Sequence, residues 1–272
     1  MRITLATWNI NSVRLRQDLV ARFLEEAAPD VLCLQETKCP DDQFPSARFR
    51  DLGYEHIAPR GQAGYHGVAT LSRIPFREVS HRQFCGKQDA RHVAITLETG
   101  AQPLVVHNFY VPAGGDEPDP DVNEKFAHKL AFLKEMRDWF GDGAAHDGHP
   151  MVLVGDLNIA PLETDVWSHK QLLKVVSHTP VEVAHLDEVR ASHGWVDVVR
   201  EHISPEEKLF TWWSYRSRDW QASNRGRRLD HIWTSPGLGT ACTGVDVLSG
   251  ARSWPRPSDH VPVTAVFDLD RL

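Results

Sequence analysis

Short apolar runs that stop abruptly at a polar residue recur along this chain. In the sharpest case Met-Val-Leu-Val at 151–154 is followed by Gly155, Asp156, Leu157 and Asn158. Such runs are typical of buried strands, and a strand end can present a polar side chain to a ligand without burying it unpaired. If the ends converge, they form one acidic, histidine-containing site suited to a divalent metal and phosphate-ester hydrolysis. Four more runs end in this way, at Asn9 and Asn11, at Glu36, at Asp230 and His231, and at Asp259 and His260.

Helical spacing of apolar residues indicates three helices between these strands. One is predicted over 13–27, ending before Pro29, a second from Phe126 to Phe140 with Asn123 as its N-cap, and a third around 181–192. Because helices and strands mix without strict alternation, the pattern favours a layered α/β or α+β fold with mixed sheets. Strands are predicted at 3–8, 31–34, 67–71, 93–97, 104–111, 151–154, 229–234, 245–248 and 261–269.

Composition limits the domain organisation and the cellular location that we expect for this chain. The 272 residues contain no clear linker, since the Pro/Gly-rich stretch 112–120 falls between a predicted strand and a predicted helix, so we expect one domain over 1–272. No run is long enough for a membrane span or placed as a secretory leader, which predicts a soluble cytoplasmic protein with reduced cysteines and no membrane partner. The net charge of −7 argues against electrostatic coating of nucleic acid, but a local basic track would still allow a nucleic-acid substrate.

Glu36 is the candidate metal ligand with the clearest setting, because it stands where a buried strand opens into a loop. Mg²⁺ or Mn²⁺ prefers such oxygen ligands. An alternative is that Glu36 caps the next turn or pairs with Lys38.

Asp156 and Asn158 are two positions apart, so both side chains share one face if the chain stays extended, and the same holds for Asn9 and Asn11. A carboxylate can accept a proton from water, and a neighbouring amide can orient that water or a phosphate oxygen. The alternative for Asp156 and Asn158 is a turn in which the Asp side chain bonds to the backbone.

His260 could face a phosphate with its charged form stabilised by a carboxylate, which Asp230 could supply from another strand. Tyr110, at the end of an apolar run, could donate to a phosphate oxygen. Each has a structural alternative, since the chain has fifteen histidines and a strand-end tyrosine is ordinarily packed.

The segment 210–228 interleaves aromatic residues with arginines and contains a single acid, Asp219. Aromatic rings stack on bases, and guanidinium groups bind phosphates, so the segment favours nucleic-acid binding over a Trp-rich edge of the core. Its members are Trp212, Trp213, Tyr215, Trp220, Arg216, Arg218, Arg225, Arg227 and Arg228.

Six short motifs, in order, resemble the series found in the exonuclease III family of abasic-site endonucleases, within the endonuclease/exonuclease/phosphatase superfamily. The match extends from residue 7 to 263. The motifs are Thr7-Trp-Asn-Ile-Asn11, Leu34-Gln-Glu-Thr-Lys38, Phe109-Tyr-Val-Pro112, Gly155-Asp-Leu-Asn158, Arg228-Leu-Asp-His-Ile232 and Ser258-Asp-His-Val261.

The resemblance implies a four-layer α/β sandwich, with two mixed β-sheets packed face to face and helices outside. It also implies a monomer that cleaves duplex DNA 5′ to abasic sites with Mg²⁺ (or Mn²⁺) and acts at 3′ ends as exonuclease and phosphatase, in the bacterial cytosol or nucleoid. The implied roles are metal binding by Glu36, Asn11 and Asp259; catalysis by Asp156, Asn158, His260, Asp230, Tyr110 and Asn9; and substrate binding by Trp212, Leu229, Arg216, Arg227 and Lys38.

Two positions depart from the family pattern. Asn11 stands where eukaryotic relatives carry Asp, and Arg227 stands where relatives place an aromatic residue, so the abasic pocket would rest on Trp212 and Leu229. The resemblance leaves open whether Asp156 activates water or protonates the leaving oxygen. Two alternatives keep the fold: a phosphoesterase acting on a non-DNA substrate such as a phosphoinositide, and a non-catalytic regulatory homologue.

Overall fold

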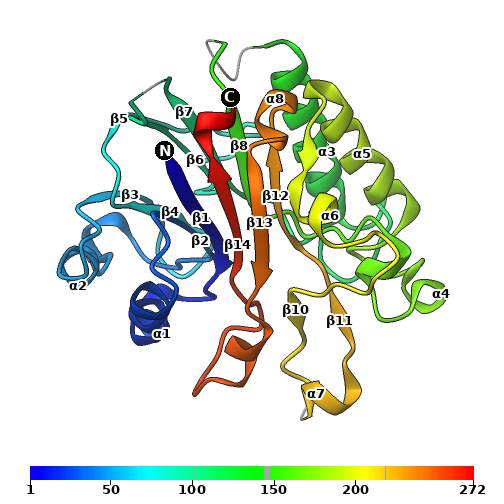
Figure 1. The fold of residues 1–272 in the computed structure, drawn as a ribbon. Coiled ribbons are helices and arrows are strands. Elements are labelled where there is room, and N and C mark those ends of the chain that lie inside the picture. Colours follow the sequence, from blue (N-terminus) through cyan, green and yellow to red (C-terminus); the bar gives the residue numbers. More distant parts are fainter. Residues whose placement is uncertain (101, 144–147, 218) are drawn as a thin grey trace.

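A computed structural model describes residues 1–100, 102–143, 148–217 and 219–272. Within these residues two six-stranded sheets form the centre of the molecule (Figure 1). The first sheet has the order β13 (Cys242–Val247), β14 (Val263–Asp268), β1 (Arg2–Asn9), β2 (Val31–Gln35), β4 (Val68–Ser72) and β3 (His56–Arg60). The second has the order β5 (Phe76–Ser80), β6 (His92–Leu97), β7 (Leu104–Tyr110), β8 (Met151–Asp156), β12 (Asp230–Thr234) and β9 (Val196–Asp197).

Both sheets are mixed. The pairs β1–β2 and β7–β8 are parallel, whereas the other pairs are antiparallel. Side chains alternate between faces along each strand. In β8, Val152 and Val154 pack in the core between the sheets, and Met151 and Leu153 face the opposite side. The sequence run at 151–154 is therefore apolar throughout because both of its faces are covered.

Helices cover the two outer faces and complete the four layers. On the first sheet, α1 (Val13–Glu26) packs against the outward side chains of β1 and β2. On the second, α3 (Glu124–Gly141) and α5 (Pro180–His193) pack together over β7 and β8. Among the described helices none is both long enough and apolar enough to cross a membrane. Shorter helices are α2 (Ser46–Arg50), α4 (His169–Leu172), α6 (Val198–His202), α7 (Trp220–Ser223) and α8 (Pro236–Gly239), with 3₁₀ turns at 41–43, 163–165, 249–253 and 269–271.

The predicted elements are present with shifts at their ends, and Asn123 caps α3 by accepting a hydrogen bond from the Lys125 amide. The sequence pattern missed three strands at sheet edges, β3, β5 and β9, because the apolar runs there are short, β5 is mostly exposed and β9 has only two residues. It also missed the ribbon β10 (Trp212–Trp213) and β11 (Gly226–Arg227).

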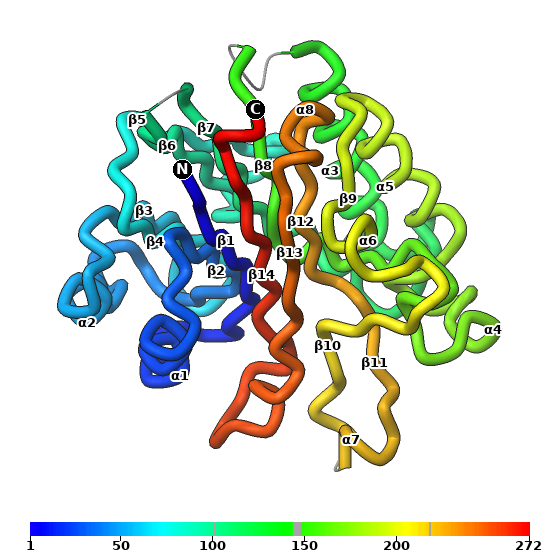
Figure 2. Tube along the Cα trace, in the orientation of Figure 1, coloured from blue at the N-terminus to red at the C-terminus, as the bar shows by residue number. Residues whose placement is uncertain are grey.

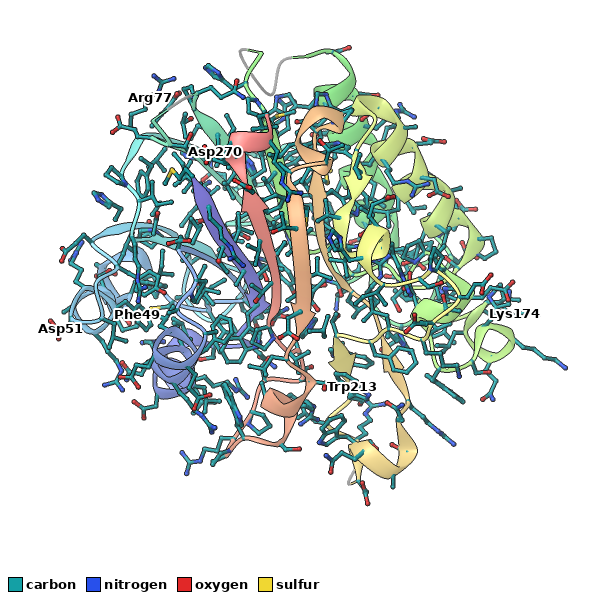
Figure 3. All side chains as sticks on the ribbon, viewed as in Figure 1. Phe49, Asp51, Arg77, Lys174, Trp213 and Asp270 are labelled. Atoms are coloured by element: carbon teal, nitrogen blue, oxygen red, sulfur yellow. The ribbon has the colours of Figure 1, made fainter. Side chains whose placement is uncertain are left out.

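The segment from β10 through α7 to β11 and the segment 248–260 project from the same end of the sandwich (Figure 2). Both chain termini lie at the opposite end (Figure 1). Figure 3 labels Trp213 at the base of the β10–β11 projection, next to the lower ends of the sheets. The predicted site residues gather at this lower end.

Candidate active site

Two parallel strand pairs, one in each sheet, bring four polar residues to the same end of the sandwich. Asn9 ends β1 and pairs with the residue before Glu36, while Tyr110 ends β7 and pairs directly with Asp156 at the end of β8. Gly155 has φ 138°, and a Cβ there would lie 1.9 Å from the Phe109 carbonyl oxygen of β7. Glycine is therefore required immediately before Asp156.

Asn9 connects the two sheets. Its Nδ2 donates to Glu36 Oε1 at 3.0 Å and to Asp156 Oδ2 at 2.8 Å, and the side chain is fully buried. Tyr110 Oη donates to the same Glu36 oxygen at 2.9 Å. One amide thus holds two carboxylates from different sheets at a fixed separation, below the pocket surface.

Asn11 and Asn158 are not extended, which corrects the expectation that each shares a strand face with its partner. Their φ angles are 46° and 55°. The backbone N–H of Asn11 donates to Asn9 Oδ1 at 3.0 Å, and the backbone N–H of Asn158 donates to Asp156 Oδ1 at 2.9 Å. Both strand ends therefore close in a side-chain-to-backbone turn, the alternative considered for 156–158, and this turn itself holds the carboxylate in place.

Lys38 links the predicted metal ligands. Its Nζ lies 2.7 Å from Glu36 Oε2 and donates to Asn11 Oδ1 at 2.6 Å, while Asn11 Nδ2 donates to Asp259 Oδ1 at 3.0 Å. Glu36 and Lys38 both have φ 49°, a strained conformation for such residues and one that accumulates at functional sites. Glu36 therefore pairs with Lys38, as the alternative interpretation proposed, and this ion pair lies within the candidate site.

The donor set fits a hard divalent cation. Glu36, Asn11 and Asp259 offer carboxylate and amide oxygens, and the Lys38 ammonium already occupies a position between two of them as a cation would. Burial raises the pKa of Glu36, but the charge and hydrogen bond of Lys38 outweigh it, so that pKa lies below its ordinary value. The carboxylate is therefore held in its ionised, ligating form.

His260 lies between two carboxylates. Its Nδ1 donates to Asp230 Oδ2 at 2.8 Å, its Nε2 lies 3.6 Å from Asp156 Oδ2, and the Thr211 hydroxyl donates to Asp230 at 2.6 Å. Burial lowers the pKa of His260, but Asp230 and Asp156 more than offset this, so the pKa is raised above its ordinary value. The imidazole is held as a cation with Nε2 available to an anion.

Burial raises the pKa of Asp156 to about 7. The charge of Asp230 adds to the rise, and the charge of His260 opposes it. A carboxyl group poised near neutrality can exchange a proton with a reacting oxygen. Asp156, Asp230 and His260 have ligand atoms within 4.8 Å of one another, forming a buried acidic and histidine cluster.

A pocket of about 640 Å³ opens above these groups. Trp212 faces it, with Nε1 donating to Asp259 Oδ2 at 2.9 Å, whereas Trp213 is buried against Trp220 and Phe210. Trp213 therefore fits the core-edge alternative, whereas Trp212 packs against Leu229 and its neighbours and also lines the pocket. The pocket is lined by Glu36, Tyr110, Ala113, Gly115, Asp116, Asn158, Trp167, Val175, Val176, Ser177, Trp212, Ser214, Arg216, Arg225, Arg227, Leu229, Asp259 and His260.

Sequence reasoning missed the residues that support the site from behind. Lys129 on α3 is fully buried and donates to the carbonyls of Asn158 at 2.8 Å and Ala113 at 3.2 Å, and to the Glu182 carboxylate. Glu182 also accepts from the Ser177 amide at 3.0 Å. Two sequence signals point to this network: a lysine within the apolar face of a predicted helix, and the Thr-x-x-Glu pattern of a capping box at 179–182.

Comparison with known proteins places the chain in a family. The model of the endonuclease/exonuclease/phosphatase family matches residues 6–260. The chain belongs to this family. It is 32% identical to the exodeoxyribonuclease III of Haemophilus influenzae, over 96% of this chain and 98% of that protein.

Two solved structures share the fold over almost the whole chain. An AP endonuclease from Archaeoglobus fulgidus has a TM-score of 0.89 and 31% identity, covering 98% of this chain and 99% of its own. A 3′ phosphatase from Neisseria, bound to a product DNA hairpin, has a TM-score of 0.87 and 30% identity, with 98% and 99% covered. The predicted family and sandwich fold are confirmed.

Proposed function

We propose that this protein is a DNA-repair phosphodiesterase that incises duplex DNA 5′ to abasic sites and processes 3′ ends as exonuclease and phosphatase. The observation that carries the proposal is the joined set Glu36–Asn9–Asp156–His260–Asp230 beneath a pocket walled by Trp212 and arginines. The relatives named above are an exodeoxyribonuclease III, an AP endonuclease and a 3′ phosphatase, which supports one site with these three activities.

The chemistry assigned to the chain's own groups is hydrolysis of the P–O3′ bond. A water oxygen attacks phosphorus, the bond to the 3′ oxygen breaks, and the products are a 3′ hydroxyl and a 5′ phosphate. Asp156 takes the proton from the water or supplies one to the leaving oxygen, and Asn158 orients the water and a phosphate oxygen. His260, kept charged by Asp230, donates to the phosphate oxygens as their negative charge grows. Tyr110 would do the same once its hydroxyl turns from Glu36 to the substrate.

Asn9 is assigned a positioning role, because its amide is already used by Glu36 and Asp156. Glu36, with Asn11 and Asp259, would hold Mg²⁺, or Mn²⁺ in its place. When bound, the metal ion would supply positive charge against the phosphate oxygens. Lys38 would then turn from Glu36 toward the substrate phosphates.

Substrate binding is assigned to the wall of the pocket. Arg216 is exposed at its rim and suits a backbone phosphate, while Trp212 and Leu229 offer apolar surface to a sugar that has lost its base. We further propose that the chain acts as a single domain over 1–272 and as a monomer, in the bacterial cytosol or nucleoid.

The test is nicking of a duplex with one tetrahydrofuran abasic analogue at micromolar enzyme. We expect Mg²⁺-dependent nicking 5′ to the analogue, and loss of at least ~10²-fold in turnover for Asp156→Asn and His260→Ala, with the fold retained. Absence of nicking would exclude the function. Hydrolysis of inositol phosphates instead would favour the non-DNA phosphoesterase, and no hydrolysis of either substrate would favour the regulatory homologue.

A further inference from the structure

The pocket is lined by two chemically different groups of residues. Glu36, Asn158 and His260 form the first group and are assigned to phosphate chemistry. The second group consists of Trp212 and Leu229, which pack together, and Arg227, which contacts Trp212, Val176 and Ser177. On the proposed function, on which this inference rests, the second group receives the sugar of the abasic nucleotide. Its polar groups therefore determine which sugar is accepted.

Arg227 is fixed in this wall. Its Nη1 donates to the Val176 carbonyl at 2.9 Å and to Ser177 Oγ at 2.7 Å, and its guanidinium lies 5.2 Å from the centre of the Trp212 ring. The backbone is fixed as well, because Arg227 pairs with Trp212 in the β10–β11 ribbon. The side chain cannot swing toward solvent without losing both hydrogen bonds and the ring contact.

Among the described residues the charge of Arg227 has no direct counterion. In the described part of the chain no carboxylate lies within ion-pair distance of it, whereas the adjacent Arg228 is fully buried and paired with Asp165 and Asp197 at 2.8 Å each. Within the described residues the side-chain hydrogen bonds of Arg227 use Nη1 only. A half-buried guanidinium with unused N–H donors on a pocket wall calls for an oxygen acceptor in the ligand.

We propose that Arg227 is a specificity-determining residue that donates a hydrogen bond to the oxygen at C1′ of the abasic sugar. An intact nucleotide carries its base at C1′, so this oxygen is the chemical mark of base loss. A backbone phosphate is the less suitable acceptor, because Arg216 and Arg225 of the same pocket are exposed and can reach the backbone, whereas Arg227 is half-buried and hydrogen-bonded to the pocket wall.

The experiment compares kcat/KM on two duplexes that differ by one atom. One contains a natural abasic site, with its C1′ hydroxyl, and the other the tetrahydrofuran analogue, which lacks that oxygen. We expect the wild type to prefer the natural site by about tenfold or more, the value of one hydrogen bond to a charged group. Arg227→Met should bring this ratio close to one, and Arg227→Gln, which keeps a neutral donor, should retain part of the preference.

The matched control is Arg225→Met, since Arg225 lies over the Trp167 ring at 4.7 Å in the same pocket. It should lower cleavage of both duplexes by a similar factor and leave the ratio intact. An unchanged ratio in folded Arg227→Met and Arg227→Gln would overturn the inference while leaving the nuclease function standing. A wild-type protein that cleaves neither duplex would instead overturn the function on which it rests.

Discussion

Nδ2 of Asn9 donates a hydrogen bond to Oδ2 of Asp156 at 2.8 Å, and this bond joins the end of β1 in one sheet to the end of β8 in the other. Because the same nitrogen also donates to Glu36, the separation between the two carboxylates is set by one amide. The spacing of the catalytic groups thus depends on how the two sheets pack.

Replacing this amide tests its positioning role. We expect Asn9→Ala to lower kcat by about ten- to a hundredfold, the cost of losing hydrogen bonds to charged groups. The KM for DNA should stay near the wild-type value, because the Asn9 side chain is fully buried beneath the pocket. Steady-state kinetics on the tetrahydrofuran duplex measure both values. A rise in KM with kcat retained would show that Asn9 contacts DNA instead.

The strand ends were visible in the sequence because a buried strand needs an apolar run and a polar residue can follow only where burial stops. Asp156 and Glu36 could be found in this way. Their joint placement around the Asn9 amide could not, since it depends on the packing of two sheets whose strand order the sequence pattern does not encode. The left-handed φ of Asn11 and Asn158 could not be predicted either, because the argument that alternate residues share a face assumes an extended chain.

The supporting residues were hidden for a different reason. Lys129 and Glu182 are 53 positions apart on two helices, and polar residues there are ordinarily assigned to the solvent face. Arg227 was visible as a departure from the family pattern, but its contact with Trp212 required the β10–β11 register.

The Asn11 position should control metal affinity. Asn11→Asp adds a charged oxygen ligand but removes the N–H that now bonds to Asp259, so two carboxylates meet when no metal is bound. We expect a lower Tm in EDTA and a larger rise of Tm on adding Mg²⁺ than in the wild type. Gln221→Glu, an amide-to-acid change at an exposed position of α7, is the control and should change neither value. A smaller Mg²⁺-induced rise would remove Asn11 from the metal site.

The buried Lys129–Glu182 pair should matter for stability as well as for pocket shape. Lys129→Met leaves the buried Glu182 carboxylate without its cation, which costs about 3–5 kcal/mol in comparable buried pairs. Urea unfolding measures the loss, and Lys125→Met, on the exposed side of the same helix, should cost little. The double variant Lys129→Met with Glu182→Gln should recover part of the stability. Equal unfolding midpoints for Lys129→Met and the wild type would contradict the assignment.

His231 should make the fold sensitive to acid. Burial, with a smaller contribution from the charge of Arg228, lowers the pKa of His231 to about 4, and its Nε2 donates to the Ile159 carbonyl at 2.8 Å. Below the unfolded pKa of about 6.5 the unfolded chain takes up a proton that the folded chain refuses, so stability falls as pH drops toward 4. Between pH 7 and about 5 this one group costs roughly 2 kcal/mol, from 1.36 kcal/mol per pH unit below 6.5.

His231→Gln keeps an N–H donor but cannot titrate. We therefore expect its urea-unfolding free energy to fall by roughly 2 kcal/mol less than that of the wild type between pH 7 and about 5, whatever the two stabilities at pH 7. The exposed Gln83→Asn, which removes no titratable group, serves as the control and should follow the wild-type pH dependence. If His231→Gln loses as much stability as the wild type over this range, His231 is protonated in the folded protein, and its burial is compensated by a partner other than the Ile159 carbonyl.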